Sequence, residues 1–120
     1  TSGDLFLSSD GLLLMATENL KKGIEYAVHQ IRSKRVDPDT KLRWMRSLTR
    51  QVEALVKVAE ALNNIEGKSA SEIDLATYLS SVETRVPAET RSIALRRATV
   101  DFHRVVLRAA RMQRAYNYEL

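Results

Sequence analysis

Apolar residues recur at steps of three and four along most of this chain, which is the spacing of one face of an α-helix. Two long stretches show this pattern. Between about residues 10 and 34 the apolar positions are Leu13, Ala16, Leu20, Ile24, Ala27 and Ile31. Between 38 and 63 they are Leu42, Met45, Leu48, Val52, Leu55, Val56, Ala59 and Leu62. The pattern predicts two amphipathic helices, the first beginning at about Asp10 or Thr17 and ending near Lys34.

The turn between these stretches contains a helix start signal. Asp37 can serve as an N-cap, and Pro38 suits a first helical position, where its missing N–H costs no hydrogen bond. Gly67 follows Asn63 at a short distance and is a typical stop signal. We therefore expect the second helix to run from about Pro38 to Asn63.

The segment from residue 4 to residue 15 allows two interpretations. Asp10-Gly11 lies between two apolar runs, which is a signal for a β-hairpin, but Ser9-Asp10 could equally cap the first helix. A hairpin on its own would have no further strands to pair with. We therefore expect an irregular N-terminal segment that packs on the rest of the fold.

Two more helices follow. Residues 69–72, Ser-Ala-Ser-Glu, form a capping box, which predicts a short third helix ending near Thr84. Its inward residues would be Ile73, Ala76, Leu79 and Val82. Pro87, with Glu89 behind it, predicts the start of a fourth helix that reaches Tyr118, a length of about 45 Å. The predicted fold is a single all-α domain over residues 1–120, a four-helix bundle with a long C-terminal helix.

The last helix separates into three faces at about 100° per residue. The predicted core face consists of Ala94, Leu95, Ala98, Phe102, Val105, Val106, Ala109, Met112 and Tyr116. A row of arginines, with Asp101 at its edge, consists of Arg97, Arg104, Arg108 and Arg111. Ile93, Val100 and Leu107 form a narrower apolar stripe. This stripe either packs on the third helix or the N-terminal segment, or contacts another subunit or a parent polypeptide.

Composition narrows the class of protein. The chain has 120 residues with 4 Gly and 2 Pro, which fits one domain with few turns and long helices. It has no cysteine, which excludes disulfides, thiolate nucleophiles and cysteine-based zinc sites. The longest apolar run, Leu12 to Ala16, is too short to span a membrane. We expect an intracellular protein, cytoplasmic or nucleoid-associated, and the missing initial Met is compatible with a fragment of a larger one.

Basic charge is concentrated at the C-terminal end. The net charge is +4, and residues 91–120 hold seven basic and two acidic residues. If the second and fourth helices are neighbours, their arginines share one face, made of Arg43, Arg46, Arg50, Arg97, Arg104, Arg108, Arg111 and Arg114. Guanidinium groups match phosphate oxygens bidentately. This predicts an accessory module that binds nucleic acid, either DNA or RNA, within a larger replication, packaging or mobile-element protein.

Two alternatives to nucleic-acid binding remain open. The arginines could form a solvated face and pair with neighbouring acidic side chains. The domain could instead be a protein-interaction or oligomerisation bundle that uses the stripe of Ile93, Val100 and Leu107.

The sequence offers few groups for catalysis. Its two histidines, His29 and His103, do not occur in HxxxH or HExxH, and no phosphate-binding glycine loop or GxSxG motif is present. We therefore predict no cofactor and no metal, and favour a binding protein over an enzyme. Arg97 and His103, separated by five residues, resemble the Arg-x(4–6)-His motif of helical ribonucleases of the HEPN type. The resemblance covers two residues and implies cleavage of RNA at a dimer interface.

Overall fold

The computed structural model describes residues 9–66, 75–87 and 92–118, and within them the side chains of 11–61, 75–87 and 92–111. Four helices and no strand lie in these ranges. They are α2 (Ser9–Arg32), α3 (Pro38–Glu66), α4 (Leu75–Arg85) and α5 (Ile93–Tyr118). The prediction of an all-α four-helix bundle with a long C-terminal helix is confirmed.

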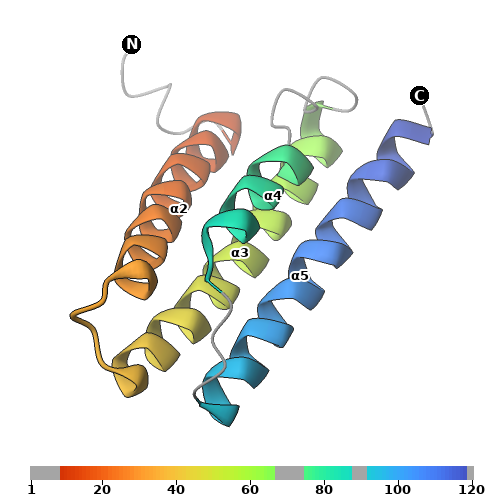
Figure 1. Cartoon of the computed structure of the whole chain (residues 1–120). Helices are drawn as coiled ribbons and strands as arrows, with labels where there is room; N and C mark the ends of the chain where they lie inside the picture. Colours follow the sequence, from red (N-terminus) through yellow and green to blue (C-terminus); the bar gives the residue numbers. More distant parts are fainter. Residues whose placement is uncertain (1–8, 67–74, 88–91, 119–120) are drawn as a thin grey trace.

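The three long helices form one layer, and the short helix α4 covers one side of it (Figure 1). Helix α3 lies in the middle of the layer and packs against both α2 and α5. Helix α4 packs mainly on α5, and α2 does not pack against α5. The molecule is therefore a flat slab with principal extents of 50 × 36 × 17 Å. Helices α3 and α5 run in the same direction, and α5 forms one lateral edge (Figure 1).

All four helices contribute to one core. The largest fully buried side chains include Ile24 of α2, Met45, Leu48 and Leu55 of α3, Leu79 of α4 and Phe102 of α5. These residues belong to the predicted apolar stripes, because a helix in a bundle buries the side on which its apolar residues recur. Ala94 is exposed, so its assignment to the core face was wrong; it lies at the margin of that face. Val28 is buried as well.

The predicted start of α3 agrees with its geometry. Pro38 is the first helical residue, and the backbone N–H of Thr40 donates to Asp37 Oδ2 at 3.1 Å. The Thr40 hydroxyl donates to Asp37 Oδ1 at 2.6 Å. These two hydrogen bonds lower the pKa of Asp37, because they favour the charged carboxylate. The helix continues to Glu66, three residues beyond the predicted end.

The expected irregular N-terminal segment was wrong for residues 9–15, and so was the hairpin alternative. Helix α2 begins at Ser9, so residues 9–15 are helical and Gly11 lies inside the first turns. The predicted start near Asp10 is correct within one residue, and the end at Arg32 lies two residues before the prediction. The remaining part of the segment, residues 4–8, and the capping box at 69–72 lie outside the described residues.

Helix α5 begins at Ile93, six residues after the predicted start at Pro87. Ser92 caps it: its side-chain oxygen accepts from the N–H of Leu95 at 3.3 Å, and its carbonyl accepts from the N–H of Arg96 at 3.0 Å. Proline is tolerated at a first helical position but does not satisfy the free N–H groups that follow. A serine hydroxyl does satisfy one of them, and it sets the start.

Candidate nucleic-acid interface

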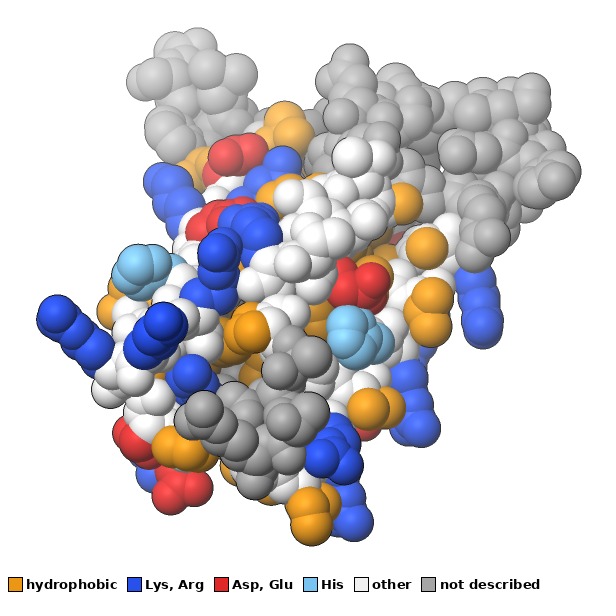
Figure 2. Space-filling view, viewed as in Figure 1, with side chains coloured by type: hydrophobic (Ala, Val, Ile, Leu, Met, Phe, Trp, Pro, Cys, Tyr) orange, Lys and Arg blue, Asp and Glu red, His pale blue; other side chains and the backbone are white. Residues whose placement is uncertain are grey.

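Helices α3 and α5 are packed neighbours, so the arginines that they carry lie on connected surfaces. Seven of the eight predicted site residues have described side chains, and all seven are exposed. We call them the basic face: Arg43, Arg46 and Arg50 of α3, and Arg97, Arg104, Arg108 and Arg111 of α5. Arg114 lies on α5, but its side chain is outside the described residues. Figure 2 shows basic side chains along the outer edge of α5, with apolar side chains among them.

A groove of about 420 Å³ separates the two helices near the start of the basic face. Arg46, Thr49 and Arg50 line it from α3, and Ala98 and Asp101 line it from α5. Arg50 Nε donates to the Arg46 carbonyl oxygen at 3.4 Å, which directs this guanidinium along α3. The small side chain of Ala98 leaves the groove open.

A second groove, of about 250 Å³, lies farther along the same pair of helices. Its α3 side carries Glu53 and Glu60 beside Lys57, and Arg108 lines it from α5. Acidic and basic groups alternate in this groove, so its net positive charge is lower than that of the rest of the basic face. The strongly basic part of the face is therefore the first half of α3 together with the outer side of α5.

None of the seven arginines has an ion pair within 4.0 Å among the residues that the structure describes. The two pairs found there are Arg85 with Glu25 and His103 with Glu83, both away from the basic face. Asp101, Glu53 and Glu60 line the grooves but do not reach the guanidinium groups. The interpretation in which the arginines pair with neighbouring acids is therefore not what the structure shows.

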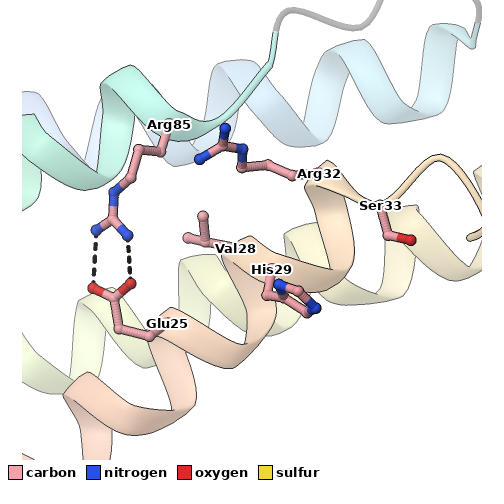
Figure 3. Close-up of a pocket in the computed structure, with 6 residues that line it drawn as sticks. All are labelled: Glu25, Val28, His29, Arg32, Ser33 and Arg85. Carbon is pink, nitrogen blue, oxygen red and sulfur yellow. Dashed lines mark hydrogen bonds and ion pairs between the residues drawn. The ribbon is translucent and has the colours of Figure 1, made fainter.

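Arg85 of α4 is fixed by a polar network at the contact of α2 with α4. It forms a two-point ion pair with Glu25, in which Nη2 lies 2.9 Å from Oε1 (Figure 3). The hydroxyl of Tyr78 donates to the same Oε1 at 3.1 Å, and Lys21 Nζ lies 5.3 Å from the centre of the Tyr78 ring. The hydrogen bonds from Arg85 lower the pKa of Glu25. Burial raises the pKa of Tyr78 well above 10, and the charge of Glu25 adds to this.

An open cleft of about 510 Å³ lies beside this network, lined also by Val28, His29 and Arg32 (Figure 3). Both guanidinium ends of Arg85 are occupied by Glu25. The network therefore joins α2 to α4. Sequence reasoning missed it, because Glu25 and Arg85 are 60 residues apart and no local pattern connects them.

The narrow apolar stripe of α5 is uncovered. Ile93, Val100 and Leu107 expose 70%, 43% and 53% of their surface. They therefore do not pack on α4 or on residues 9–15 of the N-terminal segment, and the interpretation is wrong for these described residues. Residues 4–8 of that segment lie outside the described residues. The three stripe residues lie opposite the core face of α5, whereas α3 and α4 flank that core face.

Arg97 and His103 do not converge within one chain. His103 Nδ1 lies 2.9 Å from Glu83 Oε2 on α4, whereas Arg97 is exposed. Six residues of helix rotate two side chains about 120° apart. The arrangement that the HEPN resemblance implies would require a second chain to supply one member of the pair.

Over the described residues, no group of three or more histidine, aspartate or glutamate side chains is placed to hold a metal ion. No helix in these ranges has a stretch long and apolar enough to cross a bilayer. Comparisons with protein-family models, with curated proteins and with solved structures found no match to this chain. The fold and the site define an all-α bundle with a basic face whose seven arginines have no ion pair among the described residues.

Proposed function

We propose that this bundle binds nucleic acid through contacts between the basic face and the phosphate backbone. The observation that carries the proposal is the set of seven exposed arginines on two packed, parallel helices, without ion pairs among the described residues. An arginine without a carboxylate partner keeps its full set of donors for phosphate oxygens. Arg85, which is held by Glu25, shows what a structural arginine looks like in this fold.

The rows on the two helices have a regular spacing. Arg43 and Arg50 are seven residues apart on α3, as are Arg97, Arg104 and Arg111 on α5, which is about 10.5 Å along a helix. Packed helices lie about 8–10 Å apart. One segment of backbone can therefore contact both rows. Such binding is largely independent of sequence and weakens steeply with salt, because each neutralised phosphate releases counterions.

The wider role that we propose is an accessory module of a larger replication, packaging or mobile-element protein that acts inside the cell. The basic face would hold the nucleic acid, DNA or RNA, while other parts of such a protein act on it. Arg114, one turn beyond Arg111 on α5, would extend the face.

The test is a fluorescence-anisotropy titration of labelled single- and double-stranded oligonucleotides at two salt concentrations. The variant Arg46→Gln/Arg50→Gln/Arg108→Gln removes three charges from the basic face. We expect at least about tenfold weaker binding, and a salt slope that is smaller by about one unit for each arginine. No binding by the unaltered protein at low salt would overturn the proposal.

A matched control removes the same charge elsewhere. Arg32, Lys34 and Arg35 are exposed at the end of α2 and in the turn after it. The variant Arg32→Gln/Lys34→Gln/Arg35→Gln has the same net charge as the test variant, and we expect its affinity to remain within about twofold of the unaltered protein. Equal losses in the two variants would mean that net charge, rather than the basic face, governs binding.

A second candidate function is protein interaction or self-association through Ile93, Val100 and Leu107. Their exposure along one stripe of α5 favours it, since an exposed apolar patch rimmed by polar residues can mark a protein-interaction site. Sedimentation velocity of the unaltered protein and of Val100→Glu tests it. An oligomer that dissociates in the variant would support this candidate, and a monomer in both cases excludes self-association through the stripe.

A further inference from the structure

The outermost edge of α5 alternates aliphatic side chains with arginines. At steps of four and three it carries Ile93, Arg97, Val100, Arg104, Leu107 and Arg111, which we call the α5 ridge. All six are exposed. At about 100° per residue they fall within an arc of about 80° on the side opposite Phe102, which is fully buried. Phosphate binding explains the arginines of this ridge but not its aliphatic residues.

The composition of the ridge argues against an apolar partner surface. A coiled-coil seam needs two apolar positions in every heptad, whereas the ridge has one, and the other is an arginine. A second copy of the chain would bring the arginines of the two ridges together. A helix that lies in a membrane interface needs a broad apolar face, and this stripe is one residue wide.

The major groove of B-form DNA presents partners for both kinds of side chain. Guanine offers N7 and O6 to an arginine fork, and thymine offers its 5-methyl group to an aliphatic side chain. We propose that α5 lies in the major groove of duplex DNA, with Arg104 on guanine and with Val100 and Leu107 on thymine methyl groups. This inference rests on the proposed function and narrows its ligand to double-stranded DNA. Duplex RNA does not fit, because its major groove is too narrow for a helix.

The shape of the molecule allows this docking. Helix α5 forms the lateral edge of a slab whose smallest extent is 17 Å, with α3 and α4 set back from that edge (Figures 1 and 2). A helix with its side chains is about 10–12 Å across, and the major groove is about 12 Å wide. Seven residues of helix rise about 10.5 Å, close to three base pairs at about 3.4 Å each.

The groove curves while α5 is long, so only its middle can reach base edges. Arg104 and Leu107 lie at this middle, with Val100 and Arg111 equally far to either side of it, whereas Ile93 is the first residue of α5, where the backbone crosses the helix. Arg46 and Arg50 on α3 remain beside the DNA groove and have no ion pair among the described residues, so they can contact phosphates. The α5 ridge would therefore read bases while α3 positions the protein.

The first experiment changes only the DNA. Anisotropy titrations of the full chain compare two 20-base-pair duplexes. In the first, a strand of alternating G and T pairs with a strand of alternating A and C. The second is identical except that uracil replaces every thymine. The change removes only the thymine methyl groups. Guanine and thymine alternate along the GT strand, so α5 meets both bases wherever it binds on the duplex. Each lost methyl contact should weaken binding about fourfold. We expect a loss of about sixteenfold for two contacts.

The second experiment changes the protein. The variant Val100→Ser/Leu107→Ser should bind the thymine and uracil duplexes equally. Leu12 and Met15 on α2 are exposed to a similar extent, 52% and 46%, so Leu12→Ser/Met15→Ser is a matched control that should still prefer thymine. All four side chains are exposed, and circular dichroism checks that each variant folds.

The outcomes separate this inference from the proposed function. Nucleic-acid binding that ignores the thymine methyl groups, or a preference that survives in Val100→Ser/Leu107→Ser, overturns the groove assignment and leaves phosphate binding intact. The absence of any nucleic-acid binding overturns both. A dimer that the same variant dissociates would assign the α5 ridge to a second copy of the chain, and would also overturn the groove assignment.

Discussion

At the scale of single residues, Gly23 lets α2 and α3 approach closely. A Cβ at this position would lie 2.7 Å from Gln51 Oε1 and 3.1 Å from its Cδ. Gln51 is held in place by Nε2, which donates to Ser47 Oγ at 3.0 Å. Its Oε1 is buried without a hydrogen-bond partner among the described residues. Gly23 and Gln51 are therefore coupled by contact.

We predict that the effect of Gly23→Ala depends on Gln51. In the unaltered background the new methyl displaces Gln51 and its bond to Ser47, which offsets the gain in helix propensity of about 1 kcal/mol. In the Gln51→Ala background that gain should appear as added stability. Urea unfolding of the double-mutant cycle should give a coupling of about 0.5–3 kcal/mol. Additive effects would show that the two helices adjust freely.

Glu25 makes the stability of the fold depend on pH. Its pKa in the folded protein is lowered from 4.5, chiefly by hydrogen bonds from Arg85. A depressed pKa contributes stability that is present above the unfolded value and is lost as pH falls through the folded value. Melting temperatures below pH 4.5 should therefore fall less steeply in Glu25→Gln than in the unaltered protein. An acid slope that is unchanged in Glu25→Gln would contradict this assignment.

Tyr78 makes the stability of the fold depend on pH in the alkaline range. Its pKa is raised above 10 by burial and by Glu25, so its contribution is full below pH 10 and is lost as pH rises through the folded value. Tyr78→Phe should lower the melting temperature at neutral pH but reduce the loss of stability above pH 10. A steeper alkaline loss in the variant would contradict the assignment.

At the scale of elements, the helix starts depend on caps more than on prolines. Asp37 caps α3 and Ser92 caps α5, each by accepting from a backbone N–H three residues later. Pro38 is helical because a cap precedes it, whereas Pro87 lies outside α5. The start of α5 at Ile93 follows from this rule. Sequence reasoning missed Ser92 because the proline signal came earlier in the chain.

Ser92→Ala should destabilise the protein by about 1 kcal/mol, the usual loss when a capping oxygen is removed. Ser80→Ala, an exposed position within α4, is the matched control and should be neutral or slightly stabilising, since alanine favours helix. Thermal unfolding of the two variants measures the difference. Equal midpoints would show that residues other than Ser92 set the start of α5.

At the scale of the whole molecule, the basic face costs stability. Its seven arginines have no ion pairs among the described residues, so they repel one another in the folded state. Binding of an anionic partner, as proposed above, would relieve this repulsion. The dense apolar core, with Phe102, Ile24 and Leu48 fully buried, offsets it.

We predict that salt stabilises the free protein while it weakens nucleic-acid binding. Screening shortens the range of repulsion from about 30 Å at 0.01 M salt to about 3 Å at 1 M. Arg46→Gln/Arg50→Gln should therefore be at least as stable as the unaltered protein at low salt, and this advantage should vanish at high salt. A variant that is less stable at both concentrations would mean that these arginines have structural partners.

Much of the fold could be predicted from local patterns. The spacing of apolar residues predicted α3 within three residues at each end and the end of α2 within two, while it left the start of α2 open between Asp10 and Thr17. It also placed the arginines outside the core of α5. These features depend on residues three or four positions apart along one helix, which a sequence displays directly. The class of fold and the faces of each helix were therefore determined by the sequence alone.

Only the tertiary structure decided how these faces meet. Apolar stripes on different helices are chemically alike, so a sequence does not tell which pairs pack together. The packing of α3 beside α5 joins Arg50 to the arginines of the last helix, and it leaves Val100 and Leu107 uncovered. The pairing of Glu25 with Arg85 depends in the same way on the contact of α2 with α4. Such contacts join residues far apart in the chain, so they are fixed by the shape of the whole core.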